Sequence, residues 1–289
     1  MFNNIFRVIQ ITRLFIKYDV DKMLVSCGSG KCKFYFYMLP WNWFRKRRVD
    51  NIPLKIKMML EELGPIFVKL GQVISTRKDL LGDDIANELS KLQDSVKPFP
   101  KEISMRIIEE ELGSKINEVF NSFTPEPLAS ASIAQVHEAQ LKIGKDVIIK
   151  VVRPNIKNEI EKDLLLMKRI AVFLTSLSDD FKRMHLIELV NDYEMLVYDE
   201  TDLIKESSNA KKIKKNFKDS KLIYIPEIYW DYVTKSILVM ERTYATPVND
   251  KKELKRQGIN FEQLATNAVE SFFIQVFENR SNFRTKRII

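Results

Sequence analysis

The sequence of 289 residues is poor in cysteine, glycine and histidine, with two, eight and two residues respectively. Cys27 and Cys32 provide neither a disulfide framework nor a set of zinc ligands, which excludes a disulfide-rich secreted domain and a structural zinc module. No signal peptide pattern is present, and the longest apolar run, Leu164 to Leu177, is interrupted by Lys168 and Arg169 and is shorter than the ~20 residues of a spanning helix. The 45% of hydrophobic and 30% of charged residues are typical of a helix-rich soluble protein with an ample core.

Positive charge is concentrated at the N-terminus. Residues 1–50 hold ten Lys/Arg against three Asp, a net charge of +7, whereas the whole chain carries +8. The remainder is therefore close to neutral, which argues against nucleic acid as a partner and favours a local anionic partner for this arm. A basic amphipathic helix over residues 2–9 and seven aromatics in residues 34–44, followed by Arg45-Lys-Arg-Arg48, suit the headgroup zone of an anionic membrane surface. The alternative is that the aromatics cap the helical region behind them.

The segment from Pro53 to Phe123 has the periodicity of a series of helices. The pattern from Pro53 to Leu81 is interrupted by Gly64-Pro65, which predicts a kink or two separate helices. Further helices are expected from Asp83 or Asp84, as the capping residue, to about Gln93, from Lys101 to Leu112, and from Lys115 to Phe123.

After Thr124-Pro-Glu-Pro127 the pattern changes to a two-stranded hairpin, expected between Ser132 and Val152 with a turn at Gly144-Lys-Asp146. Small residues, Ala129 to Ser132, precede it, and the return strand contains Lys150 within an apolar run. Small side chains let backbone amides approach phosphates, and a lysine in a strand neutralises phosphate oxygens, as in kinase-like nucleotide sites. The alternative for Lys150 is an edge-strand lysine that reaches water.

Helices and strands alternate in the rest of the chain. The expected elements are helices over 158–176, 186–216 and 261–277 and strands over 222–226 and 236–240. On the second of these helices Asp202 and Glu206 share a face and Glu200 points elsewhere, toward another partner. The alternative for these three carboxylates is an acidic face turned to solvent. The run Lys211-Lys-Ile-Lys-Lys215 is interpreted as the solvated face of the same helix.

Four motifs in order resemble those of the UbiB family of atypical kinase-like proteins. They are Lys69-Leu-Gly-Gln72 (K-x-G-Q), the alanine-rich segment Leu128-Ala-Ser-Ala-Ser-Ile-Ala-Gln-Val136, Glu200-Thr-Asp202 (E-x-D), and Val239-Met-Glu-Arg242, which is similar to the linker between the lobes. The resemblance implies an α+β fold: a protein-kinase-like small lobe, with a small antiparallel sheet plus helices, an N-terminal helical extension and the start of a large lobe.

The resemblance also implies a site for ATP, with Mg²⁺ in complete members of the family. The implied cofactor-binding residues are Leu128, Ala129, Ser130, Ala131, Ser132, Ile133, Ala134, Gln135, Val136, Lys150, Met240 and Glu241, the last two through backbone groups at the adenine ring. The implied supporting residues are Lys69 and Gln72 on a helix that folds over the nucleotide, Glu200 and Asp202 near the phosphates, and Glu206 paired with Lys150. No metal-ligand set is predicted.

One departure from the family follows Phe273-Ile-Gln-Val-Phe277. UbiB proteins continue with Phe-Phe-His-Ala-Asp-x-His-Pro-Gly-Asn and later with a metal-binding Asp-Phe-Gly-like triplet, whereas this sequence reads Glu278-Asn-Arg-Ser-Asn-Phe-Arg-Thr-Lys-Arg-Ile-Ile289. The simplest interpretation is a truncation or frameshift near residue 280 that removes the catalytic loop, so no catalytic residue is assigned.

The resulting hypothesis is an ATP-binding, kinase-like ATPase or regulator that supports ubiquinone biosynthesis and is inactive as written. The alternatives are a non-catalytic nucleotide-binding or membrane-scaffold module and an unstable, pseudogene-like fragment. Expected partners are ATP, an anionic membrane surface, and ubiquinone-biosynthesis proteins or lipid precursors, at the cytoplasmic face of the inner membrane and attached peripherally. The expected divisions are a membrane-facing arm (1–50), a helical extension (51–123), a nucleotide-binding small lobe (124–242) and the start of the large lobe (243–289).

Overall fold

The computed structural model describes residues 2–20, 38, 51–92, 96–218 and 220–278. These residues form two compact units, each discontinuous in sequence. The helical unit comprises Met1–Phe99, Ala129–Gln135 and Val152–Thr201, and the sheet unit comprises Pro100–Leu128, Val136–Val151 and Asp202–Ile289. The two cysteines, the aromatic and basic residues of 34–48, and residues 279–289 lie outside the described residues, so the interpretations placed on them stay predictions. The four divisions expected from the motifs also stay a prediction.

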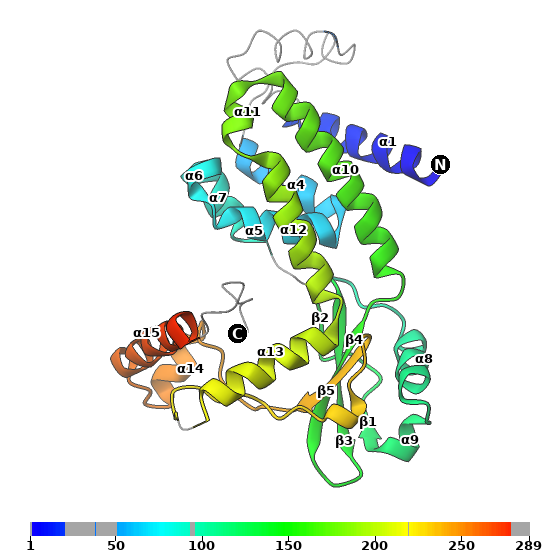
Figure 1. Ribbon diagram of the computed structural model, residues 1–289, viewed down its shortest axis with the longest axis vertical. Helices are drawn as coiled ribbons and strands as arrows, with labels where there is room; N and C mark the ends of the chain where they lie inside the picture. The colour runs from blue at the N-terminus through cyan, green and yellow to red at the C-terminus, as the bar shows by residue number, and fades with distance from the viewer. Residues whose placement is uncertain (1, 21–37, 39–50, 93–95, 219, 279–289) are drawn as a thin grey trace. The chain divides into compact units, whose positions relative to one another are not determined.

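The helical unit is built from amphipathic helices around an apolar core. Its elements are α1 (Phe2–Lys17), α4 (Ile52–Leu63), α5 (Pro65–Ser75), α6 (Lys78–Leu81), α7 (Asp83–Leu89), β2 (Ala129–Ser130), α10 (Ile156–Leu177), α11 (Asp179–Arg183) and α12 (Leu186–Glu200). Helices α10 and α12 run side by side, and α4 packs against both α5 and α7 (Figure 1). The core includes Ile66, Leu89, Ile160 and Val197, each at most 2% exposed, because the apolar positions of each helix recur on one face.

The break between α4 and α5 lies where the sequence predicts it. Asn51 caps the start of α4 by accepting a hydrogen bond from the Leu54 amide, and Gly64 ends the helix with φ 106°. Pro65 then begins α5, because its fixed φ suits a first helical turn but its missing N–H cannot continue a preceding helix. The expected division at Gly64-Pro65 is therefore confirmed.

The sheet unit contains an antiparallel sheet with the strand order β1-β3-β4-β5, and β2 pairs with β3 outside this order. Its elements are α8 (Lys101–Leu112), α9 (Ile116–Val119), β1 (Phe120–Phe123), β3 (Ala134–Leu141), β4 (Asp146–Val152), α13 (Leu203–Asn216), the 3-10 helix η3 (Trp230–Tyr232), β5 (Ile237–Glu241), α14 (Lys251–Arg256) and α15 (Phe261–Glu278). The ends of β3 and β4, residues 134–135 and 152, group with the helical unit.

The hairpin β3–β4 and its neighbour β5 follow the predicted pattern. Alternate residues Val147, Ile149 and Val151 of β4 are fully buried, as expected for a strand with one face on the core. Gly144 supplies the positive φ, 77°, that the turn requires. Lys150 lies opposite Leu238 of β5 in the antiparallel register. The hairpin, the strand near Met240 and the helix over 261–277 are confirmed.

Four local expectations were wrong. Residues 222–226 form no strand; instead the Tyr229 amide donates to the Val239 carbonyl, and Ile228 makes an isolated bridge with Met240. Asp83 and Asp84 lie in the first turn of α7, whose cap is Gly82, where their charges favour the helix N-terminus. The helix expected over 115–123 stops at Val119, and residues 120–123 form strand β1, which pairs with β3.

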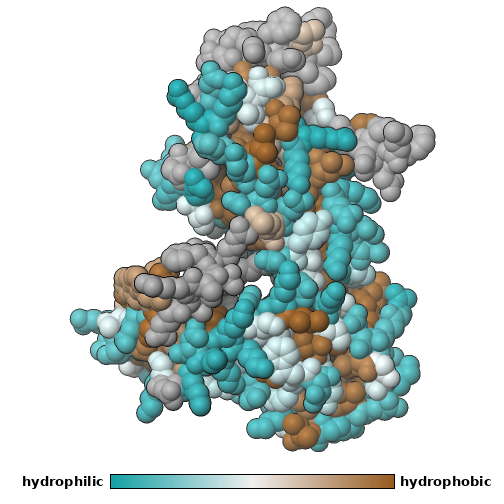
Figure 2. Space-filling view, in the orientation of Figure 1, coloured by the Kyte–Doolittle hydropathy of each residue, from teal (hydrophilic) through white to brown (hydrophobic). Residues whose placement is uncertain are grey.

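The fourth correction concerns the long helix expected over 186–216. It is divided at Thr201 and Asp202 into α12 and α13. The exposed lysines near the end of α13, within Lys211 to Lys215, do form a hydrophilic surface on that helix (Figure 2).

Among the described residues, no helix combines the length and apolar character that crossing a membrane demands.

Candidate functional site

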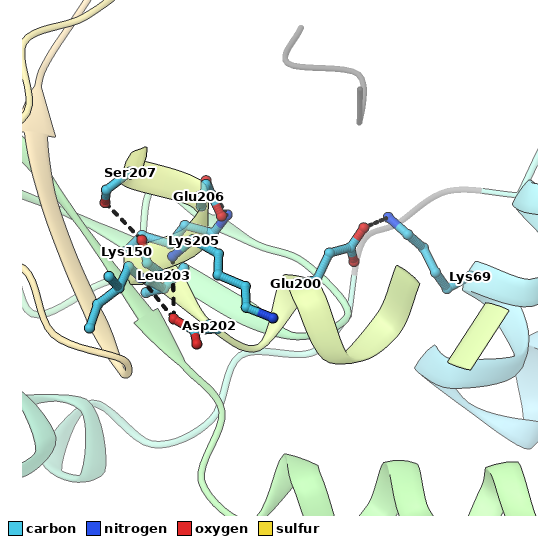
Figure 3. Close-up of polar contacts among 9 residues, drawn as sticks. Lys69, Lys150, Glu200, Asp202, Leu203, Lys205, Glu206 and Ser207 are labelled. Carbon is cyan, nitrogen blue, oxygen red and sulfur yellow. Dashed lines mark hydrogen bonds and ion pairs between the residues drawn. The ribbon is translucent and has the colours of Figure 1, made fainter. Parts of the chain in front are cut away.

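The centre of the candidate site is a two-point contact between Lys150 and Glu206 in the sheet unit. The Lys150 ammonium Nζ lies 2.8 Å from Oε1 and 2.7 Å from Oε2 of Glu206 (Figure 3). Their side chains are 28% and 32% exposed, so water partly screens the pair. Strand β4 places Lys150 and the first turn of α13 places Glu206, while α13 packs against β5. The expected contact is present; the role of the pair in holding a nucleotide stays a prediction.

Asp202 has a different local role from the one that a continuous helix predicts. It adopts an extended backbone and accepts hydrogen bonds from the amides of Ile204, at 3.1 Å, and Lys205, at 3.3 Å (Figure 3). Aspartate is a strong N-cap because its carboxylate satisfies amides that lack partners inside the helix. Asp202 and Glu206 therefore do not share a helical face, and that expectation is corrected: one caps α13 and the other projects from its first turn.

Lys69 and Glu200 form an ion pair within the helical unit. The Lys69 ammonium lies 3.3 Å from a Glu200 carboxylate oxygen, which joins the K-x-G-Q helix α5 to the end of α12 (Figure 3). A second link joins the same helices, because the buried Tyr193 hydroxyl donates to the Ile66 carbonyl. The expectation that Glu200 serves a partner other than that of Asp202 is confirmed. A place for these residues near phosphates stays a prediction.

The remaining K-x-G-Q residues fix α5 in the helical unit. The side-chain amide of Gln72 donates to the Leu92 carbonyl at 3.2 Å. Gly71 is buried, and a β-carbon added there would lie 2.5 Å from Leu92 Cδ1 and 2.8 Å from Leu60 Cδ1. The atoms that come closest to this glycine therefore belong to leucine side chains. Only a residue without a side chain fits this position without displacing its neighbours.

The alanine-rich segment is half buried and internally hydrogen-bonded. Leu128 and Ala129 are exposed, whereas Ser132, Ile133, Ala134 and Gln135 are at most 4% exposed. The Ala131 amide donates to the Ala134 carbonyl at 2.8 Å, which closes a turn, and the Leu128 amide donates to the Val136 carbonyl at 2.8 Å. The segment is therefore a fixed bend, as a phosphate-binding backbone must be. Contact of this bend with a nucleotide stays a prediction.

Met240 and Glu241 lie at the end of β5 in the sheet unit. Met240 pairs with Ile148, and the Glu241 amide donates to the Glu227 carbonyl at 2.8 Å. The Glu241 carboxylate accepts hydrogen bonds from the Tyr224 hydroxyl, at 2.5 Å, and from the Glu227 amide, which together lower the pKa of Glu241. An adenine ring that bound the Glu241 amide would have to replace Glu227. The predicted adenine contact of these residues remains a prediction.

The donor set suits a nucleotide better than it suits a permanently bound metal. A lysine ammonium oriented by a carboxylate is the kinase arrangement for the α- and β-phosphates. Within the part of the chain that the structure describes, no group of three or more His, Cys, Asp or Glu side chains could hold a metal ion. Within the sheet unit, Lys150 would be the residue that holds phosphate oxygens, with Glu206 orienting it.

A small antiparallel sheet whose lysine contacts a helix glutamate is the arrangement found in the small lobe of kinase-like proteins. Residues 91–285 match the model of the ABC1 atypical kinase-like domain. The chain belongs to the ABC1 atypical kinase-like family, and its resemblance to UbiB proteins is confirmed.

Two relatives illustrate this similarity. A protein of Pseudomonas aeruginosa (strain LESB58) named "Probable protein kinase UbiB" is 44% identical over 276 residues, which are 94% of this chain and 52% of that protein. A protein of the same name from Azotobacter vinelandii (strain DJ / ATCC BAA-1303) is also 44% identical over 276 residues, 94% of this chain and 51% of its own. The chain thus spans about half the length of the curated relatives it matches.

One solved structure, the complex of Rv3197 with erythromycin from Mycobacterium tuberculosis, is also similar. It has a TM-score of 0.43 and 26% sequence identity, and the match covers 70% of this chain and 50% of that one. A TM-score below 0.5 supports no further conclusion about this chain.

Sequence reasoning missed two residues that shape the site, Tyr193 and Arg153. Tyr193 is 1% exposed and bonds a backbone carbonyl of α5. Arg153 follows β4 and bonds carbonyls at 97 and 131. Both side chains donate to backbone carbonyls, and the type of a residue does not show whether its carbonyl will accept such a bond. The available signals were indirect: a tyrosine on the apolar face of a helix, which needs a partner for its hydroxyl, and an arginine directly after a buried strand.

Proposed function

We propose that this chain binds ATP as the nucleotide-holding part of a UbiB-like atypical kinase or ATPase. The observation that carries the proposal is the contact of Lys150 with both carboxylate oxygens of Glu206. A cation in the middle of a sheet strand, held in a fixed orientation by a glutamate on an adjacent helix, is suited to phosphate oxygens. Membership of the ABC1 family supports the same conclusion.

The relatives also support a proposal for the cellular role. The similarity to proteins named "Probable protein kinase UbiB" supports a place in ubiquinone biosynthesis, with proteins or lipid precursors of that route as partners. The chain spans about half of those relatives, and we propose the same activity for the whole protein.

The proposal separates binding from catalysis. The 289 residues contain neither a His-Ala-Asp-x-His-Pro-Gly-Asn segment nor an Asp-Phe-Gly triplet. In kinases these segments supply the aspartates that handle the substrate proton and hold Mg²⁺. These residues alone are therefore proposed to bind ATP without sustained hydrolysis. Continued phosphate release by purified 1–289 that is lost in Lys150→Ala would contradict this part.

Binding itself is tested by titration calorimetry with Mg-ATP on the 1–289 protein. Lys150→Met and Glu206→Gln should each weaken binding by about tenfold or more, because one removes the cation and the other frees it from its orientation. Lys142→Ala is the matched control, since Lys142 is an exposed lysine of the same hairpin. Equal affinity of the wild type and Lys150→Met would refute the proposed site.

We also propose that the basic arm attaches the protein peripherally to an anionic membrane, at the cytoplasmic face of the inner membrane. The support is the net charge of +7 in residues 1–50 and the aromatics beside Arg45 to Arg48.

A further inference from the structure

Arg153 is the residue directly after β4, and it contacts the alanine-rich segment at three points within the helical unit. Its backbone amide donates to the Ile133 carbonyl at 2.8 Å. Its side chain donates from Nε to the Ala131 carbonyl at 3.2 Å and from Nη2 to the Ser130 hydroxyl at 2.8 Å. One residue therefore holds the bend on both sides of Ser132, which is itself buried.

The same arginine joins the bend to the segment that precedes α8. Arg153 Nη2 also donates to the Lys97 carbonyl at 3.0 Å, and the guanidinium carbon lies 5.5 Å from the centre of the Phe99 ring. Two further bonds tie the segments together: the Val96 amide donates to the Ser130 carbonyl at 3.1 Å, and the Phe99 amide donates to Gln135 Oε1 at 3.2 Å. Arg153 therefore connects two backbone segments, residues 96–99 and 129–135, that do not belong to the same helix or strand.

These contacts match the chemistry of arginine and not that of lysine. A guanidinium offers five donors in one plane and can also stack on a ring, so it can serve several acceptors of fixed direction at once. Burial lowers the pKa of Arg153 below its ordinary value, which reflects the cost of taking the charge out of water. The hydrogen bonds to carbonyls offset that cost.

The direction of these bonds has a consequence for the neighbouring amides. In a trans peptide the C=O of one residue and the N–H of the next point in opposite directions. By holding the carbonyls of Ala131 and Ile133, Arg153 also fixes the orientation of the two peptide planes that carry the Ser132 and Ala134 amides. A backbone that binds an anion needs peptide planes in a fixed orientation. The bend contains no glycine that would favour such a conformation locally.

We propose that Arg153 is a positioning residue that sets the affinity of the segment 129–135 for the phosphate chain of the nucleotide. This inference rests on the proposed binding of ATP. Arg153 itself makes no contact with the nucleotide in this proposal. It acts through the backbone carbonyls that it holds.

The test compares ligands that share the base and sugar but differ in phosphates. Adenosine, Mg-ADP and Mg-ATP are titrated calorimetrically into wild-type 1–289, Arg153→Met and Arg153→Lys. Arg153→Met should weaken ADP and ATP by about tenfold or more and leave adenosine unchanged, because only the phosphates meet the bend. Arg153→Lys should restore part of the loss. Arg169→Met, an exposed arginine on α10, is the matched control. A parallel loss for all three ligands, or no loss for ADP and ATP, would overturn the proposal.

Hydrogen exchange without nucleotide separates this inference from the proposed function. The amides of Ala131, Val96 and Phe99 are hydrogen-bonded around Arg153 and should exchange faster in Arg153→Met, but not in Arg169→Met. If Arg153→Met does not fold, Arg153→Lys provides the same comparison. Unchanged exchange at these amides would end the positioning role. Absence of nucleotide binding by the wild type, with exchange altered as expected, would instead refute the proposed function.

Discussion

Arg7 of α1 and Asp163 of α10 form a two-point ion pair inside the helical unit. Arg7 Nε lies 2.8 Å and Nη2 lies 2.9 Å from the two carboxylate oxygens, and Nη2 also donates to the Leu63 carbonyl at 2.8 Å. The Asp163 side chain is 8% exposed, and its burial raises its pKa even though Arg7 acts in the opposite direction. The pair therefore holds the first helix at the break between α4 and α5.

Removing the arginine should cost more stability than removing the carboxylate charge. Arg7→Met leaves an ionised carboxylate buried without its partner and should lower the free energy of unfolding by about 3–5 kcal/mol at neutral pH. Asp163→Asn should cost less, because it leaves the arginine, which is more exposed, with its bond to Leu63. Without Arg7 the folded-state pKa of Asp163 rises further above its unfolded value, so the deficit of Arg7→Met should shrink as pH falls toward that pKa. Urea unfolding at pH 5 and 7 measures both effects. A loss of unfolding free energy in Arg7→Met that is the same at pH 5 as at pH 7 would contradict this account.

Asp202 gives a second prediction, about helix capping. The carboxylate accepts two amides at the start of α13, so Asp202→Ala should reduce the free energy of unfolding by about 1 kcal/mol. Asp202→Asn retains a side-chain oxygen and should be close to the wild type, since asparagine caps helices about as well. Urea unfolding of the three proteins provides the measurement. An asparagine variant as unstable as the alanine variant would show that the charge matters more than the cap.

The sequence predicted those parts of the fold that depend on local pattern. The hairpin with Lys150, the break at Gly64-Pro65 and the contact with Glu206 were all accessible, because periodicity, a proline and a family motif each mark them. The division of the helix at Asp202 was missed although aspartate favours N-caps, since the apolar periodicity continues through it.

Long-range contacts were not accessible from pattern. The helical unit combines α4 and α5 with α10 and α12, which follow the hairpin in sequence, and the pairs Tyr193 with Ile66 and Lys69 with Glu200 join them. Hydrogen bonds to backbone carbonyls, such as those of Tyr193 and Arg153, have no sequence signature at the acceptor, because every residue carries a carbonyl.

The basic arm gives a third prediction. Replacing Arg45, Lys46, Arg47 and Arg48 by glutamine should weaken binding to vesicles that contain anionic lipid, by about 1 kcal/mol for each charge removed. This change is a cleaner test than deletion of residues 1–50, which would also remove Arg7 from Asp163. The control makes the same charge change at Lys211, Lys212, Lys214 and Lys215, which are exposed on α13. Co-sedimentation decides: equal losses in the two variants would indicate a general effect of net charge and not docking through the arm.

His137 gives a fourth prediction, about the pH dependence of stability. It is fully buried in β3, stacks on Phe123 with ring centres 5.3 Å apart, and its Nδ1 lies 3.1 Å from the Thr124 carbonyl. Burial lowers the pKa of His137 below the ordinary 6.5, against the backbone carbonyls of Thr124 and Pro125 and the charge of Glu126, which act to raise it. The unfolded chain therefore takes up a proton at a pH where the folded chain does not.

Stability should consequently be complete above about pH 6.5 and fall as the pH drops through the lower folded-state pKa of His137. His137→Gln removes the titrating group, so its unfolding free energy should change less between pH 7 and pH 5 than that of the wild type, whatever its value at pH 7. The matched control is His185→Gln, since the His185 side chain is 73% exposed and the chain contains only these two histidines. Chemical denaturation at a series of pH values measures the slope. A slope in His137→Gln as steep as in the wild type and in His185→Gln would assign the acid sensitivity to other groups.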